Sequence, residues 1–373
     1  MIKNATNKYS YIFYWPTHSG WPFFCLSFIL AHINDYLFSL LFEIRFVGKY
    51  VCYKNYILAY TINYIRFENM TKPTIANWIA LICLGIIWGG SFMGAKLALI
   101  SFGPMTVALL RVSLASMVLL IITIASGRKF PKFSTPTDRR IWLHITLMGL
   151  LTNSIPFSLL NWGQLYVSSG FAGVTMAVVP LLVLPLSHFI LKSNEMVPRK
   201  IFGFIIGFIG IIVLIGPTQL IINTGASLEP LARIACIVAA LCYGLGSINT
   251  RLCPPVSIMA YSTGGLIIGA ILLAPVALFI EGIPQWPETT ALVGTIYLGL
   301  FPTALATILL VSIINSAGPA FMSMVNYQVP LWAIAFGVFF LNEEVPTSFI
   351  AALGLIMIGL AISQSKAKQK TSL

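Results

Sequence analysis

Charge is what this sequence has least of. Asp, Glu, Lys and Arg together make up only 9% of its 373 residues, and just 10 residues are acidic. A soluble domain of this length needs a surface rich in charged side chains to stay dissolved. The shortage therefore excludes an ordinary soluble protein and favours a chain that lies in a lipid bilayer.

Three further absences exclude classes of site. No GxxxxGK[ST] motif occurs, so no P-loop ATP site is expected. The six cysteines form no CxxC pair, which favours small packing residues over metal or redox sites. The net charge of +12 falls in short loops rather than in a basic stripe with interleaved aromatics, so no nucleic-acid partner is expected. The sequence predicts no cofactor and no metal.

Long hydrophobic runs, by contrast, fill most of the chain, and the mean hydropathy is +0.91. Their length of about 20 residues fits membrane-spanning helices, because strands of a membrane barrel need only about 10. The sequence predicts an all-α integral membrane protein with ten transmembrane helices. These helices are expected at 75–97, 103–126, 141–163, 170–191, 199–216, 230–250, 257–280, 290–313, 319–341 and 346–364.

Lys and Arg gather in the loops of one face, as the positive-inside rule requires of the cytoplasmic side. We therefore expect a multi-pass protein of the cell (plasma or inner) membrane with both termini in the cytoplasm. That face would hold Lys72, Arg128, Lys129, Lys132, Arg139, Arg140, Lys192, Arg199, Lys200, Arg251, Lys366, Lys368 and Lys370. The other face would hold five of the ten acidic residues and few cations, with Lys96 as a candidate member: Glu229, Glu281, Glu288, Glu343, Glu344 and Arg233.

Residues 1–69 have a different composition, rich in Tyr, Phe, Asn and Ile. Their one apolar run, Trp21–Phe42, is interrupted by His32, Asn34 and Asp35, and no signal-peptide order is present. One interpretation is that translation begins at Met70 and the upstream segment is a mis-assigned extension. The other is a real segment that is disordered or weakly inserted in the membrane.

The two halves of the remainder resemble each other. Gly170, Glu195 and Pro198 correspond to Gly318, Glu343 and Pro346 at a shift of 148 residues. The stretch WGGSFMGAK likewise corresponds to YGLGSINTR at a shift of 155. Because each half has five spans, an odd number, the second half must enter the membrane from the opposite side. The sequence predicts two inverted five-helix repeats, the architecture that permits alternating access.

Three stretches carry a resemblance to a known family: IIWGGSFMGAKLAL with GPMTVALLRVSLASMVLL, VTMAVVPLLVLPLSHFILKSNEMVPRKIFGFIIGFIGIIVL, and NYQVPLWAIAFGVFFLNEEVPTSFIAALGLIMIGLAI. The chain resembles the drug/metabolite transporter superfamily in its ten-helix EamA-type form. Asn194-Glu195 and Asn342-Glu343 stand where that family commonly has Gly-Glu. The resemblance covers about 70–365 and implies a first repeat at 70–216, a linker at 217–229, a second repeat at 230–365 and a basic cytoplasmic tail at 366–373.

Polar side chains within the apolar spans are the candidate substrate-binding residues, since a polar group is costly to keep in a bilayer. Several lie near Pro156, Pro180, Pro302 and Pro330, which can each free a backbone carbonyl near the middle of the bilayer. The alternative for each is interhelical hydrogen bonding that serves packing alone. The candidates are Trp88, Ser91, Asn153, Asn161, Gln164, Tyr243, Thr303, Asn326 and Gln328.

Two cations are candidates of a second kind. Arg111 lies about eight residues into its span and is expected either to snorkel to the headgroups or, as the resemblance implies, to clamp neighbouring carbonyls. Lys96 ends the first span and would act as an interfacial anchor or attract anionic groups at a vestibule. Glycines such as Gly203, Gly207, Gly210, Gly354 and Gly359 are expected to provide small faces for close helix contact.

The function expected is a secondary transporter, an exporter, of small metabolites such as amino acids, related amphipathic compounds or drugs. Its partners would be a small-molecule substrate and the lipid bilayer, with a homodimer as a further candidate. An integral-membrane enzyme acting on lipid-type substrates is one alternative, but its chemistry would need paired carboxylates or a His/Asp cluster. A non-transporting membrane scaffold is the other.

Overall fold

The computed structural model describes residues 73–191, 197–216 and 228–364, and these residues form helices and no β-strand. The chain divides into two units, Met1–Asn69 and Met70–Leu373, and all the described residues belong to the second. The interpretations of residues 1–69 and of the basic tail at 366–373 lie outside the described residues, as does most of the expected linker, 217–227.

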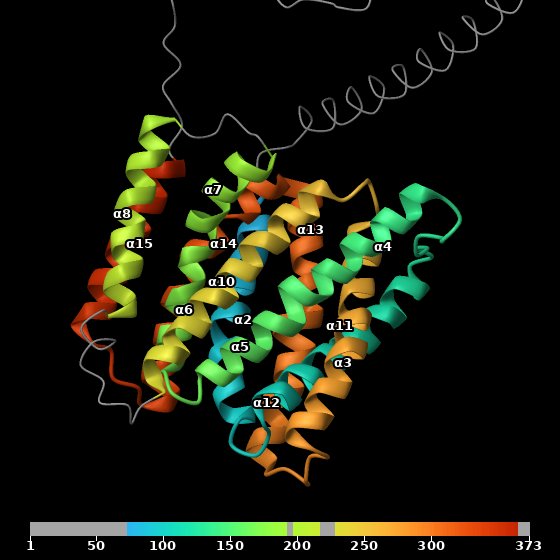
Figure 1. Cartoon of the computed structure of the whole chain (residues 1–373), viewed down its shortest axis with the longest axis horizontal. Helices are drawn as coiled ribbons and strands as arrows, with labels where there is room; N and C mark the ends of the chain where they lie inside the picture. Colours follow the sequence, from blue (N-terminus) through green and yellow to red (C-terminus); the bar gives the residue numbers. More distant parts are fainter. Residues whose placement is uncertain (1–72, 192–196, 217–227, 365–373) are drawn as a thin grey trace, which may run out of the picture. The chain divides into compact units, whose positions relative to one another are not determined.

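The helices follow one another closely along the chain (Figure 1). The first part contains α2 (Ile75–Ala98), α3 (Pro104–Ala125), α4 (Pro136–Met148), η1 (Gly149–Ser154), α5 (Ile155–Gly163), α6 (Ser169–Thr175), η2 (Met176–Val178), α7 (Val179–Leu191) and α8 (Pro198–Ile215). The second contains α10 (Glu229–Leu252), α11 (Ile258–Glu281), α12 (Thr289–Gly299), η3 (Leu300–Leu305), α13 (Ala306–Met322), α14 (Val325–Leu341) and α15 (Thr347–Gln364).

Eight helical stretches in the described residues are long and apolar enough to cross a membrane, and α14 and α15 are apolar but shorter. The prediction of an all-α membrane protein is confirmed. The span expected at 319–341 is divided by a turn at Ser323 and Met324, so that α14 begins at Val325, and its predecessor extends beyond 313. A separate break lies at Gly318, next to the expected start, where a φ of 86° kinks α13. Glycine tolerates this conformation, and the proline that follows it disfavours the α region at position 318.

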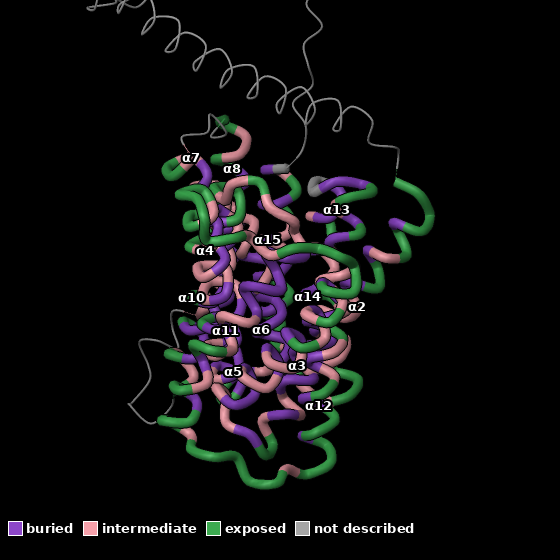
Figure 2. The backbone as a smooth tube through the Cα atoms, turned by 90° about the vertical axis from the view of Figure 1, so that its right-hand side faces the viewer, coloured by how far each residue is buried: buried purple, intermediate pink, exposed green. Residues whose placement is uncertain are grey.

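Helices from the two parts of the chain are interleaved. The most extensive contacts pair α8 with α15, α2 with α14, α3 with α11, and α5 with α10. Each pair joins a helix before residue 216 to one after residue 228, so neither part has a core of its own. In Figure 2 the buried backbone runs through the middle of the bundle, including α6, and most of the connecting loops are exposed.

Glycines permit the closest of these contacts. Gly203 on α8 and Gly359 on α15 cross so closely that a Cβ on either would clash with the backbone of the other helix. On α2, a Cβ at Gly89 would clash with Trp332 of α14. The expected small-residue faces are thus confirmed at Gly203 and Gly359. The expectation is wrong for Gly354, which has no neighbour within 4 Å among the described residues, because it faces away from α8.

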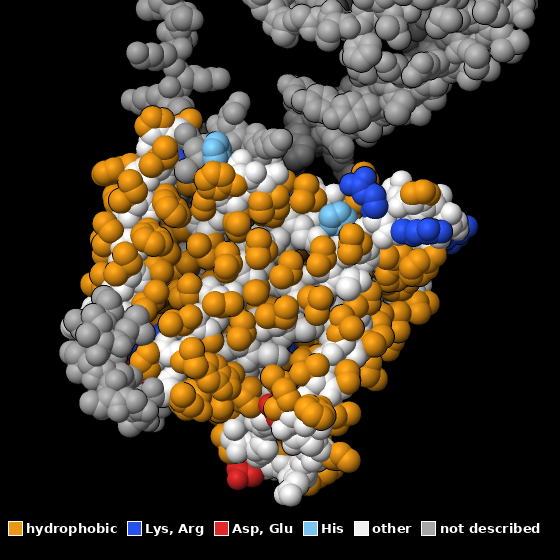
Figure 3. Space-filling model, in the orientation of Figure 1, with side chains coloured by type: hydrophobic (Ala, Val, Ile, Leu, Met, Phe, Trp, Pro, Cys, Tyr) orange, Lys and Arg blue, Asp and Glu red, His pale blue; other side chains and the backbone are white. Residues whose placement is uncertain are grey.

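Charged side chains lie at opposite ends of the bundle. Figure 3 shows Lys and Arg gathered beside the start of α4 and acidic groups at the other end, below a broad hydrophobic surface. The basic group includes Arg128, Lys129, Lys132, Arg139 and Arg140 around the α3–α4 loop. The acidic group includes Glu281 and Glu288 around the α11–α12 loop. A hydrophobic belt between two charged ends is the surface that a bilayer covers.

Candidate functional site

Two segments of π-helix interrupt the longest spans. η1 lies in the middle of Pro136–Gly163, and η3 lies in the middle of Thr289–Gly318. Each contains a hydroxyl that bonds a carbonyl five residues earlier: Ser154 Oγ donates to Gly149 O at 3.2 Å, and Thr303 Oγ1 donates to Leu298 O at 2.8 Å. π-Helical turns are rare and occur frequently at functional sites. Both lie where the sequence placed its proline-associated polar residues, Asn153 and Thr303.

Arg111 extends from α3 between these two segments. Its Nε donates a hydrogen bond to Thr303 Oγ1 on η3 at 2.8 Å. Its guanidinium carbon lies 3.8 Å from the centre of the Phe157 ring on α5, a cation–π contact. The side chain is only 7% exposed, so it does not snorkel to an interface. It also clamps no carbonyl, because its hydrogen bond within the described part of the chain goes to a hydroxyl.

One group of the candidate polar residues is buried and engaged within the protein. Ser91 Oγ donates to the carbonyl of Trp88 at 2.6 Å, and Asn161 Nδ2 donates to the carbonyl of Pro104 at 3.0 Å. Asn153 Nδ2 lies 3.3 Å from Thr152 Oγ1. Gln164 is buried, and its Oε1 has no partner within the described residues. The Asn161 contact joins α5 to α3, the Ser91 and Asn153 contacts lie within single helical segments, and most of the polar groups involved are already satisfied.

A second group of candidates is neither fully buried nor engaged in hydrogen bonds within the protein. Trp88, Tyr243, Asn326 and Gln328 are partly exposed, and within the described residues none of their side-chain polar atoms has a hydrogen-bond partner. Gln328 of α14 packs on Gly85 of α2, where its Oε1 would lie 2.8 Å from a Cβ at that glycine. These side chains therefore keep donors and acceptors free for a ligand.

Two aromatic residues that sequence reasoning missed connect the groups. Tyr297 of α12 packs over Gly90 and Gly94 of α2, and its hydroxyl donates to the carbonyl of Ile87 at 3.4 Å. The Phe157 ring lies 6.5 Å from that of Tyr243, centre to centre. The Arg111 guanidinium therefore lies against the Phe157 ring of α5, and that ring packs against Tyr243 of α10.

Two glutamates at the acidic end were also missed as structural elements. Glu281, the last residue of α11, accepts hydrogen bonds from the backbone N–H groups of Met105 and Thr106 at 2.8 Å each, at the start of α3. Glu343, just after α14, accepts three from Ser169 and Gly170 at the start of α6. A carboxylate at a helix N-terminus satisfies free N–H groups and complements the helix dipole.

Lys96 is half-buried near the end of α2. Of its two expected roles, an anchor at the interface agrees with this position. The role of Lys96 in attracting anions remains a prediction.

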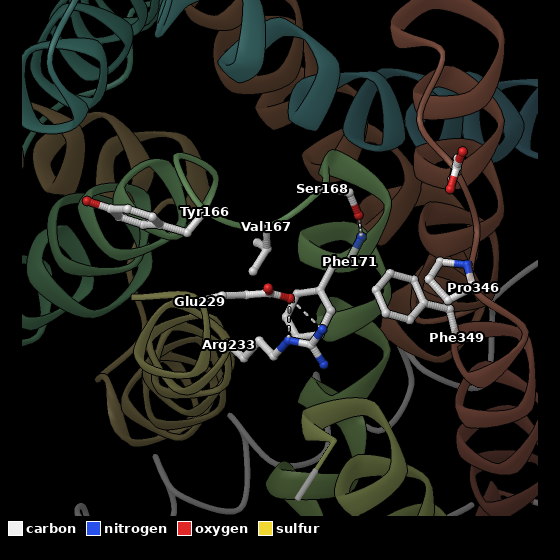
Figure 4. Close-up of a pocket in the computed structure, with 9 residues that line it drawn as sticks. Tyr166, Val167, Ser168, Phe171, Glu229, Arg233, Pro346 and Phe349 are labelled. Atoms are coloured by element: carbon white, nitrogen blue, oxygen red, sulfur yellow. Dashed lines mark hydrogen bonds and ion pairs between the residues drawn. The ribbon is translucent and has the colours of Figure 1, made fainter. Parts of the chain in front are cut away.

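A small pocket opens at the outer edge of α6, α10 and α15 (Figure 4). Its volume is about 190 Å³. Its charged groups pair with each other, since Arg233 Nη2 lies 2.6 Å from Glu229 Oε1. None of the candidate residues lines it, and its polar groups are mostly engaged, so we do not assign the site to it. No cluster of three or more His, Cys, Asp or Glu suited to a metal occurs within residues 73–191, 197–216 and 228–364.

Comparison with known proteins agrees with the geometry. The sequence model of the EamA-like transporter family matches this chain twice, at residues 76–216 and 231–364. The chain is 27% identical over 288 residues to "Uncharacterized inner membrane transporter YedA" of Escherichia coli K12, covering 76% of this chain and 89% of that protein. It is 24% identical over 284 residues to "Uncharacterized transporter YoaV" of Bacillus subtilis, covering 76% and 94%.

Among solved structures, one crystal structure shares the fold with a TM-score of 0.55 at 17% sequence identity. The match covers 78% of this chain and 96% of that one.

Proposed function

Because the chain belongs to the EamA-like transporter family and is a membrane transporter, we propose that it is a secondary transporter that exports small amphipathic metabolites. Amino acids, related compounds and drugs are the proposed substrate classes. Transport would proceed by alternating access between two inverted five-helix repeats, 70–216 and 230–365. The family match to two separate stretches, 76–216 and 231–364, supports this division.

The observation that carries the proposal is the pair of π-helical segments, η1 and η3, in corresponding spans of the two parts. Their polar residues, together with Arg111, Phe157 and Tyr243, come from both parts of the chain. A site built from two repeats is exposed to one side or the other when the repeats rock against each other. Interleaved helix pairs such as α2–α14 and α3–α11 would be the surfaces that slide.

Within this proposal, Trp88, Tyr243, Asn326 and Gln328 contact the substrate. The aromatic rings would pack against its apolar part, and the amide groups would orient its polar end. Ser91, Asn153, Asn161, Gln164 and Thr303 would hold the helices that carry these contacts. We place both termini in the cytoplasm of a cell membrane, with the basic end of Figure 3 inside.

The test is transport by the purified full chain in liposomes. Counterflow of radiolabelled solute would be measured across a panel of amino acids, nucleosides and cationic drugs. Vesicles of known protein orientation would show the direction of transport. If no solute on the panel exchanges above protein-free liposomes, the proposed function fails.

A further inference from the structure

Two arginines of this chain are buried to the same extent but differ in how their charge is neutralised. Arg111 and Arg233 are each 7% exposed. Each guanidinium carbon also lies over a phenylalanine ring: Arg111 at 3.8 Å from Phe157 and Arg233 at 5.2 Å from Phe171. Because burial and the ring contact are alike, Arg111 and Arg233 differ chiefly in the polar groups that accept their hydrogen bonds.

Arg233 is fully provided with partners. Its Nε and Nη2 donate to Glu229 Oε1 at 3.1 and 2.6 Å, and its Nη1 donates to the carbonyls of Leu214 and Ile215 at 3.4 and 3.2 Å. The carboxylate cancels the charge, and every nitrogen of the guanidinium is used. This is the usual arrangement for a buried ion, because an unpaired charge is costly in a medium of low dielectric constant.

Arg111 lacks such partners. Only its Nε donates a hydrogen bond within the described residues. Its two Nη groups have no acceptor there, yet neither is sealed off, since both keep accessible surface. The acidic residues of the described chain all lie at helix ends or in loops: Asp138, Glu229, Glu281, Glu288, Glu343 and Glu344. The protein therefore presents an uncompensated positive charge, with two free amino groups, inside the bundle.

The surroundings of Arg111 select the ligand. A guanidinium with two free amino groups matches the two oxygens of a carboxylate, which accept parallel hydrogen bonds. The Phe157 ring against the guanidinium and the Tyr243 ring that packs on Phe157 offer contact to an apolar or aromatic body. One uncompensated cation balances one negative charge, which favours a monoanion over a dianion such as phosphate.

We propose that Arg111 binds the carboxylate of the transported solute, and that the solute is a monocarboxylic acid with an aromatic or apolar body. The inference rests on the proposed function and narrows its substrate class. Thr303 acts as a positioning residue: its hydroxyl accepts from Arg111 Nε and itself donates to Leu298 O within η3. The π-helical turn thus sets the plane of the guanidinium and leaves its Nη edge open.

The experiment compares matched acids and amides binding to the purified full chain in lipid nanodiscs at pH 7.4. The probes are benzoate, phenylacetate and 3-phenylpropanoate, each with its neutral carboxamide. Affinity is measured by isothermal titration calorimetry. Because charge-assisted hydrogen bonds to Arg111 are available only to the acid, we expect at least one acid to bind about tenfold or more tightly than its amide.

Substitutions test whether the preference for the acid over its amide comes from Arg111. Arg111→Gln should abolish that preference, and Arg111→Lys should retain part of it. Thr303→Val should reduce it, and Thr303→Ser should restore it. Arg233→Gln is the matched control and should leave the preference intact, because Arg233 is neutralised within the protein. If Arg111→Gln does not fold, the acid-over-amide affinity ratios of Arg111→Lys and Thr303→Val decide whether Arg111 binds the carboxylate.

Three results would overturn the inference: no acid binds the wild type, acid and amide bind equally, or the Arg111 variants keep the full preference. Liposome counterflow separates this failure from that of the proposed function. A wild-type chain that exchanges other solutes while binding no monocarboxylate remains a transporter with a different substrate. A chain that exchanges no solute refutes the proposed function itself.

Discussion

The carboxylate of Glu343 accepts a hydrogen bond of 2.7 Å from the backbone N–H of Ser169, a residue 174 positions earlier in the sequence. It also accepts from the Ser169 hydroxyl at 2.8 Å and from the Gly170 N–H at 3.1 Å. The end of α14 is therefore bound to the start of α6. Glu281 binds the start of α3 in the same way, so both carboxylates join helices from different parts of the chain at the acidic end.

Replacing Glu343 should destabilise the folded chain. Glu343→Ala leaves the N–H groups at the start of α6 without acceptors, at an expected loss of about 1–3 kcal/mol in the free energy of unfolding. The measurement is thermal unfolding of the purified protein in detergent. Glu344→Ala is the neighbouring control, because Glu344 is exposed. Equal melting temperatures for the two variants would contradict a stabilising role for Glu343.

A side chain at Gly89 should separate α2 from α14. A Cβ at this position would clash with the Cβ of Trp332 and with the backbone of α14. Neither can move aside as the end of a flexible side chain could. We expect Gly89→Val to lower the yield of monodisperse protein sharply, an overpacking cost of about 1–3 kcal/mol or more. Gly354→Ala is the control, since nothing lies within 4 Å of that position. A normal elution profile for Gly89→Val would show that these helices are not closely packed.

Truncating the unengaged polar residues should impair transport without impairing folding. Trp88→Ala and Asn326→Ala each remove a side chain that is partly exposed and has no internal hydrogen bond within the described residues. Counterflow in liposomes should fall while the yield of folded protein stays near wild type. Trp286→Ala, in the exposed α11–α12 loop, should change neither. Loss of yield with unchanged specific activity would make Trp88 and Asn326 structural.

The orientation can be tested at two exposed loop positions. In a chain whose six cysteines are replaced by serine, Ser134→Cys lies beside the basic α3–α4 loop and Gln285→Cys in the acidic α11–α12 loop. Because the basic loops should face the cytoplasm, an impermeant maleimide should label Gln285→Cys in intact cells and Ser134→Cys only after lysis. The opposite labelling pattern would reverse the proposed topology.

Helix positions were largely predictable from the sequence. A helix in lipid must be apolar along its length, so local composition marks α2, α3 and α11 to within a few residues. The start of α14 at Val325 was placed too early, since the chain has a kink at Gly318 and a separate turn at Ser323 and Met324, and composition marks neither. Glycine is common in this chain, with 29 copies, and composition does not show which of them takes a positive φ.

The candidate site was predictable only in part. Asn161 and Trp88 look alike to a reader of the sequence, since both are polar or amphipathic groups within apolar runs. The structure separates them: Asn161 bonds the carbonyl of Pro104, and Trp88 has no partner within the described residues. Phe157 and Tyr297 were missed because a chain with 25 Phe and 14 Tyr gives no local sign of which rings surround a cation.

The sequence by itself determined that this chain is helical, lies in a membrane and belongs to a transporter family, because apolar length and family motifs are properties of contiguous residues. Tertiary structure alone decided the partner of Arg111. Arg233 pairs with a carboxylate four residues away, a spacing on one helix that the sequence displays, whereas the hydroxyl bound by Arg111 is 192 residues away and carries no charge. Hydrogen bonding and charge balance depend on which distant groups the fold brings within about 3 Å, and no local pattern encodes that distance.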